Sequence, residues 1–140
     1  MEKSKHALVV DQLKATKWLS IKELVKEPIL LEKYTEDQLW CLFSTDLLKA
    51  FLWIRSKHNA PITITSAFRY MRADLSGHNF GYSLDLKAKD MKKLREIAKL
   101  CPYLTEIEDE SFTPTWVHIS TRPSMIKGIR FISGNKSIKG

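Results

Sequence analysis

Two histidines and one aspartate have the residue types and the order of a catalytic metal site. His78 and Asp85 lie seven positions apart with a glycine between them, and His118 follows in the alternating segment 115–120. Seven positions exceed one helical turn, so we expect a tight turn that leads into a short strand at 82–86 and brings the first two ligands together. Two imidazoles and one carboxylate suit zinc with an open fourth position for water. The same set also suits iron(II).

Three segments of the chain together resemble the zinc D-Ala-D-Ala carboxypeptidase and phage endolysin peptidase family. They are Ile-Thr-Ser-Ala-Phe-Arg at 64–69, Ser-x-His-x-x-Gly-x-x-x-Asp at 76–85, and Trp-Val-His-Ile-Ser at 116–120. The last segment is closest to the small subgroup that carries Trp-x-His-x-Ser. The resemblance covers residues 60–132 closely and the N-terminal third only loosely. It implies that His78, Asp85 and His118 hold Zn²⁺.

The resemblance also implies a general base for a water molecule, and this chain departs from the family there. Relatives carry a glutamate three residues before the last histidine, where this chain has Thr115, or at the end of the preceding strand, which aligns with Phe112. Because the turn here looks two residues longer, we expect Glu110 to be the general base. Glu108 shares its strand face and is the alternative. A third reading is that the acids from Glu106 onward form a solvated surface.

Two further residues are implied to bind the substrate. Arg69 matches the family's arginine, whose planar guanidinium can grip a carboxylate or carbonyl group with two parallel hydrogen bonds. Ser76 matches the serine that lies near the substrate amide. The loop between Arg69 and His78 is shorter than in most relatives, and Ser83 replaces their usual alanine. These departures bear on substrate specificity more than on metal binding.

The resemblance therefore implies a zinc metallopeptidase that cleaves a peptide bond in bacterial peptidoglycan, either a phage endolysin or a D,D-carboxypeptidase-like hydrolase. The N-terminal residues do not form a signal peptide. We accordingly expect a cytoplasmic protein which, if phage-encoded, is made in the host cytoplasm and then released to the cell wall. The missing glutamate at its usual offsets keeps a different class open, a non-catalytic metal-stabilised domain that binds the cell wall or another surface.

Composition limits the other function classes. A chain of 140 residues with 44% hydrophobic and 28% charged residues is typical of one soluble globular domain. No apolar run approaches the ~20 residues that cross a bilayer, so membrane insertion is not expected. The net charge of +7 favours polyanionic partners. Nucleic acid is not expected, because the lysines are scattered and form no basic stripe with interleaved aromatic residues. We expect a monomer.

Four residues outside the motifs are not expected to take part in function. Cys41 and Cys101 lie in apolar runs and are expected to be buried free thiols, since a cytosolic chain rarely carries disulfides. His6 and His58 match no motif and are expected at the surface.

The pattern of elements predicts an α+β fold, in which N-terminal helices and one crossing helix back a small antiparallel sheet that bears the zinc site. All 140 residues form this single domain, with 1–36 as the loosely matched helical part and 134–140 as a flexible tail. Capping boxes begin helices at Ser20 and Thr35, the second helix running through Ile54. Asp90 caps a third helix that runs to Leu100. Strands are expected at 62–66, 82–86, 103–110, 115–120 and 126–132.

Overall fold

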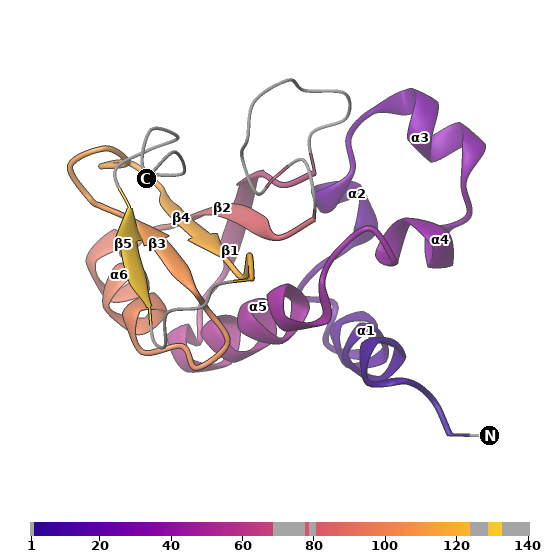
Figure 1. Cartoon of the computed structure of the whole chain (residues 1–140), viewed down its shortest axis with the longest axis horizontal. Helices are drawn as coiled ribbons and strands as arrows, with labels where there is room; N and C mark the ends of the chain where they lie inside the picture. The colour runs from indigo at the N-terminus through magenta and orange to yellow at the C-terminus, as the bar shows by residue number, and fades with distance from the viewer. Residues whose placement is uncertain (1, 69–77, 79–80, 124–128, 133–140) are drawn as a thin grey trace.

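A computed structural model describes residues 2–68, 78, 81–123 and 129–132. The chain has an α+β fold in which five helices precede the sheet and a sixth lies between its second and third strands (Figure 1). The helices are α1 (Lys5–Thr16), α2 (Ile21–Leu24), α3 (Pro28–Lys33), α4 (Glu36–Trp40), α5 (Thr45–His58) and α6 (Met91–Lys99). The strands are β1 (Ile62–Ser66), β2 (Ser83–Ala88), β3 (Glu106–Glu108), β4 (Val117–Ser120) and β5 (Arg130–Ile132). The predicted fold class is confirmed.

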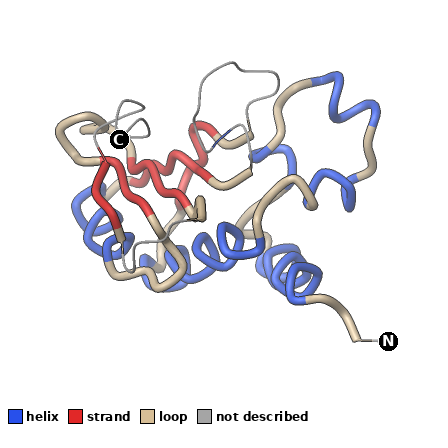
Figure 2. The backbone as a smooth tube through the Cα atoms, viewed as in Figure 1, coloured by secondary structure: helices blue, strands red, loops and turns tan. Residues whose placement is uncertain are grey.

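The strands form one sheet in the order β1-β2-β4-β3-β5, which Figure 2 shows as a continuous layer beside the helices. The first four strands pair in antiparallel fashion, and β5 runs parallel to β3 at the edge. The order places β2 and β4 side by side at the centre, with Asp85 directly opposite His118. Residues that lie 33 positions apart in the chain are thus cross-strand neighbours.

One face of the sheet is apolar and packs against helices. Its side chains alternate along the strands, as the two-residue period of a strand requires. They are fully or almost fully buried: Ile62, Ile64, Leu84, Leu86, Ile107, Val117 and Ile119. Helix α6 contacts both β2 and β4, and α5 packs against α6 and α1. This layer is the hydrophobic core, and it fixes the backbone from which the other face projects.

The opposite face carries polar side chains, yet it is also buried. Ser83, Asp85, His118 and Ser120 are each less than 9% exposed, and so is Glu106 on β3. The sequence predicted a half-buried strand at 115–120, and this was wrong because Val117–Ser120 is buried on both faces. Alternation of apolar and polar residues reports which face joins the core. It does not report whether the polar face meets water.

The expected long helix from Thr35 to Ile54 is two helices. The capping box at Thr35 does begin α4, but α4 ends at Trp40, and Ser44 starts a new helix by accepting a hydrogen bond at its Oγ from the Leu47 backbone N–H (3.0 Å). The Ser44 backbone N–H donates to the carbonyl of Gly81 (2.9 Å). A helical stripe of apolar residues runs through the break, which is why the pattern alone concealed it.

Other boundaries follow local chemistry. Asp90 caps α6 as predicted, accepting from the Lys93 backbone N–H at 3.0 Å. The strand expected at 103–110 is shorter, since β3 spans only Glu106–Glu108. Asp109 ends it by accepting from the backbone N–H of Ser111 (2.9 Å), which closes a turn. The predicted tail at 134–140 lies outside the described residues.

The predictions for Cys41 and His58 were wrong. Both cysteines are free, but Cys41 is exposed while Cys101 is buried. Burial raises the pKa of the Cys101 thiol to about 11. His58 is 1% exposed at the end of α5, not a surface residue. His6 is half-buried and lies 3.0 Å from the Phe43 carbonyl through Nε2. None of the described helices is long and apolar enough to cross a membrane.

Candidate metal centre

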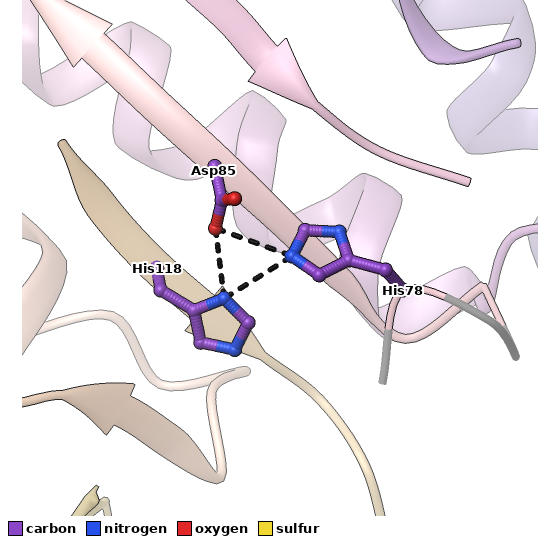
Figure 3. A group of neighbouring side chains, drawn as sticks. All are labelled: His78, Asp85 and His118. Atoms are coloured by element: carbon purple, nitrogen blue, oxygen red, sulfur yellow. Dashed lines mark hydrogen bonds and ion pairs between the residues drawn. The ribbon is translucent and has the colours of Figure 1, made fainter. Parts of the chain in front are cut away.

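The structure brings the three predicted ligands into one buried group. The Nδ1 atom of His118 lies 2.8 Å from Oδ1 of Asp85, and Nε2 of His78 lies 3.2 Å from each of those two atoms. Figure 3 shows the two rings and the carboxylate pointing toward one another, Asp85 from β2, His118 from β4 and His78 from the segment that precedes β2. Among the described residues, this is the one group of three or more His, Cys, Asp or Glu side chains arranged to hold a metal ion.

The size of this triangle fits a tetrahedral metal. Ligand atoms bound at ~2.0–2.1 Å to a tetrahedral zinc ion lie roughly 3.3 Å apart from one another. The three observed separations, 2.8, 3.2 and 3.2 Å, are close to that value without any rearrangement. Three ligand atoms at three corners of a tetrahedron leave the fourth corner for a water molecule or a substrate oxygen. The group can therefore hold a metal ion.

His78 is oriented by a second contact that also fixes its proton. Its Nδ1 lies 2.7 Å from the carbonyl oxygen of Ala67. A carbonyl oxygen only accepts, so Nδ1 carries the proton, and in the neutral ring Nε2 presents a lone pair toward Asp85 and His118. Metal-binding histidines are commonly held in this way by a backbone carbonyl. The Ala67 carbonyl lies just after β1, so the core strand sets the direction of a metal ligand.

Asp85 is ionised in spite of its burial. Burial by itself raises the pKa of this carboxyl, but hydrogen bonds and charge from His118 and His78 outweigh it and hold the pKa well below its usual range. A carboxylate that is charged at neutral pH and accompanied by two imidazole nitrogens is a ready cation site. Without a cation, hydrogen bonds from the two imidazole rings satisfy this carboxylate instead.

Gly81 shapes the turn between the first two ligands. Its φ of +72° is in the left-handed region that L side chains rarely adopt. A Cβ at this position would lie 1.7 Å from the carbonyl oxygen of Leu42, so the α4–α5 connection leaves no room for one. Just beyond, the Thr121 backbone N–H donates to the Tyr82 carbonyl (2.8 Å), and Thr121 Oγ1 lies 2.8 Å from Ser44 Oγ. The metal-site turn is thus anchored to both the helical layer and β4.

The two candidate general bases line one pocket near Arg95 but differ in exposure. The β3–β4 register pairs Glu106 with Ser120 and Ile107 with Ile119, and the two-residue period of a strand puts Glu108 on the same polar face as Glu106. Glu108 is half-buried. Glu110 lies beyond the strand with its side chain 69% exposed, and its Oε1 is 3.8 Å from Nε of Arg95 on α6. Arg95 belongs to the helix that packs on the apolar face.

Two predicted site residues cannot be placed, and one pair was missed. Arg69 and Ser76 lie outside the described residues. Sequence reasoning did not find Arg122, whose Nη2 donates to both carboxylate oxygens of the buried Glu106 at 2.9 and 3.0 Å. This pair lies on the same face of the sheet as His118 and Ser120. The available signal was the alternation of acidic and apolar residues from Glu106 to Glu108, which predicts that Glu106 lies on the polar face.

Comparisons with known proteins add no assignment: no family model and no curated protein sequence matches the chain. The functional case therefore depends on the geometry of this group and on the sequence resemblance.

Proposed function

We propose that this protein is a zinc-dependent peptidase that cleaves a peptide bond in bacterial peptidoglycan. The observation that carries the proposal is the convergence of His78 Nε2, Asp85 Oδ1 and His118 Nδ1 to within 3.2 Å of one another. The family resemblance of the three segments that supply these residues selects zinc over iron and a peptide bond over other substrates. When bound, zinc would act as a Lewis acid and lower the pKa of a water ligand toward ~7.

The residues of the chain supply the remaining requirements of hydrolysis. A general base must lie within reach of the water proton, directly or through one water molecule. Glu108, half-buried on the polar face that carries His118, meets this condition better than the exposed Glu110, which contacts Arg95. We therefore assign the general base to Glu108 and keep Glu110, the choice from sequence, as the competing prediction. Arg69 would orient the substrate through its carboxylate or carbonyl oxygens, with Ser76 near the substrate amide.

The first experiment asks whether the protein is a metal-dependent wall hydrolase. Purified protein is added to a suspension of bacterial peptidoglycan, and turbidity is followed with no addition, with a chelator, and with zinc restored after chelation. We expect clearing that the chelator abolishes and zinc restores. Released products identify the bond that is cut. A wild-type protein that binds zinc stoichiometrically but releases no peptide from any peptidoglycan supports instead a metal-stabilised wall-binding domain.

A matched pair of variants then separates the two candidate bases. Glu108→Gln and Glu110→Gln make the same chemical change two residues apart and keep the shape of the side chain. General-base removal typically costs ~10²–10⁴-fold in rate. We expect that loss for Glu108→Gln with zinc content unchanged, and nearly wild-type turnover for Glu110→Gln. The reverse result would return the role to Glu110 and would mean that the turn moves when substrate binds.

A further inference from the structure

A basic groove lies in the helical layer, apart from the metal group. It has a volume of about 540 Å³ and runs between α1 and α5, with Tyr103 from the segment before β3 at one side. Three lysines from two helices line it: Lys5 from α1, and Lys49 and Lys57 from α5. None of the described residues that line the groove is acidic.

Two of the three lysines contact aromatic rings. The Nζ atom of Lys49 lies 5.8 Å from the ring centre of Tyr103, and that of Lys57 lies 5.7 Å from the ring centre of Trp53. Cation–π contacts of this kind hold an ammonium group in place without neutralising it. Within the described part of the chain, none of the three lysines has a carboxylate within ion-pair distance. The groove therefore carries a concentrated positive charge that lacks an internal partner.

The groove and the metal group face away from each other. The residues of α5 that line the groove, among them Lys49, Trp53 and Lys57, lie on the side of the helix opposite its buried residues, such as Phe51 and Ile54. That buried side forms part of the core beneath the apolar face of the sheet, whereas Asp85 and His118 project from the polar face. A long ligand in the groove would leave the metal group open to substrate.

We propose that this groove binds a linear phosphate-bearing polyol or sugar-phosphate chain of the bacterial cell wall. The three unpaired ammonium groups complement a chain of phosphodiesters, and the apolar floor around Leu8 and Leu52 suits the carbon backbone between them. A single-stranded nucleic acid fits less well. Its bases need open aromatic faces for stacking, and here Lys49 and Lys57 already lie over the rings of Tyr103 and Trp53. The choice of a wall polymer rests on the proposed function at the wall.

The test measures binding of purified poly(glycerol phosphate) chains to the full-length protein by calorimetry over a range of salt concentrations. The groove variant is Lys5→Gln/Lys49→Gln/Lys57→Gln. The control variant, Lys22→Gln/Lys26→Gln/Lys92→Gln, removes the same charge from exposed lysines elsewhere. A lysine near an anionic surface contributes about five-fold in affinity, so the groove variant should bind on the order of 100-fold more weakly than the control, with a shallower salt dependence. Circular dichroism verifies that both variants fold.

Several results would overturn the inference. Equal weakening in both variants would mean that the attraction comes from net charge and not from the groove. No binding of the polymer by the wild type would also reject it. Tighter, groove-dependent binding of an oligothymidylate, or of vesicles made of equal parts phosphatidylglycerol and phosphatidylcholine, would assign the groove to nucleic acid or to membrane instead.

The polymer contains no peptide bond, so its binding is independent of hydrolysis. His118→Ala, which removes a metal ligand, should bind the polymer as the wild type does. Polymer binding by a protein without peptidase activity would reject the proposed function alone. Peptidase activity without polymer binding would reject the groove alone.

Discussion

The two faces of the sheet are both buried, but burial has opposite consequences on them. On the apolar face, burying Leu84, Leu86 and Ile119 is favourable at ~25 cal/mol per Å². On the polar face, burying Asp85 and His118 costs free energy unless each group is paired. The same two strands, β2 and β4, supply both sets of side chains. One face thus provides the stability with which the other holds a costly arrangement of charged and polar groups.

Removing a candidate metal ligand from the polar face should have the largest effect on zinc content and turnover. His118→Ala deletes one of the three converging ligand atoms, so we expect zinc content to fall from one per chain to near zero and metal-dependent turnover to fall to background. Metal analysis of protein purified without chelator checks this, with His6→Ala as a control outside the group. Stoichiometric zinc in both His78→Ala and His118→Ala would refute the site.

Truncating a side chain on the apolar face should lower stability and leave zinc binding unchanged. Leu84→Ala lies next to Asp85 but points into the core, where it is 0% exposed. We expect the free energy of unfolding to fall by ~2–5 kcal/mol, as for other buried leucines, while zinc stoichiometry is kept in the folded fraction. Urea unfolding and metal analysis on the same samples test the division, and Leu100→Ala, 75% exposed, is the control. Loss of zinc from folded Leu84→Ala would show that the two faces are not separable.

A buried histidine in the helical layer should make the stability of the protein depend on pH. Burial lowers the pKa of His58, and the charges of Lys93 and Arg55 lower it further against a smaller opposing effect of Asp90. Its Nδ1 has no hydrogen-bond partner among the described residues. Below pH ~6.5 the unfolded chain binds the proton more readily than the folded chain, so the free energy of unfolding should fall as pH decreases from there toward the folded pKa.

Urea unfolding at several pH values, with chelator present throughout, measures this loss. His58→Gln cannot take up the proton, so the variant should show a flatter pH dependence than the wild type. The metal group is identical in the two proteins, so its contribution cancels in the difference. Identical slopes for the two proteins would show that His58 is not a source of the acid sensitivity.

The smallest expected effect concerns a hydroxyl on the polar face. Ser83 is 1% exposed, and its Oγ has no hydrogen-bond partner in the described part of the chain. Because an unpaired buried hydroxyl is unfavourable, Ser83→Ala should be neutral or stabilising by up to ~1 kcal/mol. Ser120→Ala is the matched control, since Ser120 lies opposite in the register and its Oγ accepts from the Arg122 backbone N–H at 3.2 Å. A marked loss of activity in Ser83→Ala would show that the hydroxyl serves the substrate.

Part of this protein could be derived from its sequence because the relevant signals are local. The α+β class, the span of β1 at Ile62–Ser66 and the cap of α6 by Asp90 follow from alternation and capping chemistry within a few residues. His78, Asp85 and His118 were identified as a set because their types and spacing match a known pattern, and the structure does bring them together.

Only the tertiary structure could decide features that depend on distant partners. The helix break before Ser44 coincides with the hydrogen bond of that residue to Gly81, and the register of β3 on β4 decides how Glu108 is buried. Burial of the polar face, and of His58, follows from how the layers stack. Side-chain periodicity determines which face of a strand or helix a residue lies on. The burial and the hydrogen-bond partners of that residue depend on residues far along the chain. That is why the three candidate ligands could be grouped from sequence while the residues that support them could not.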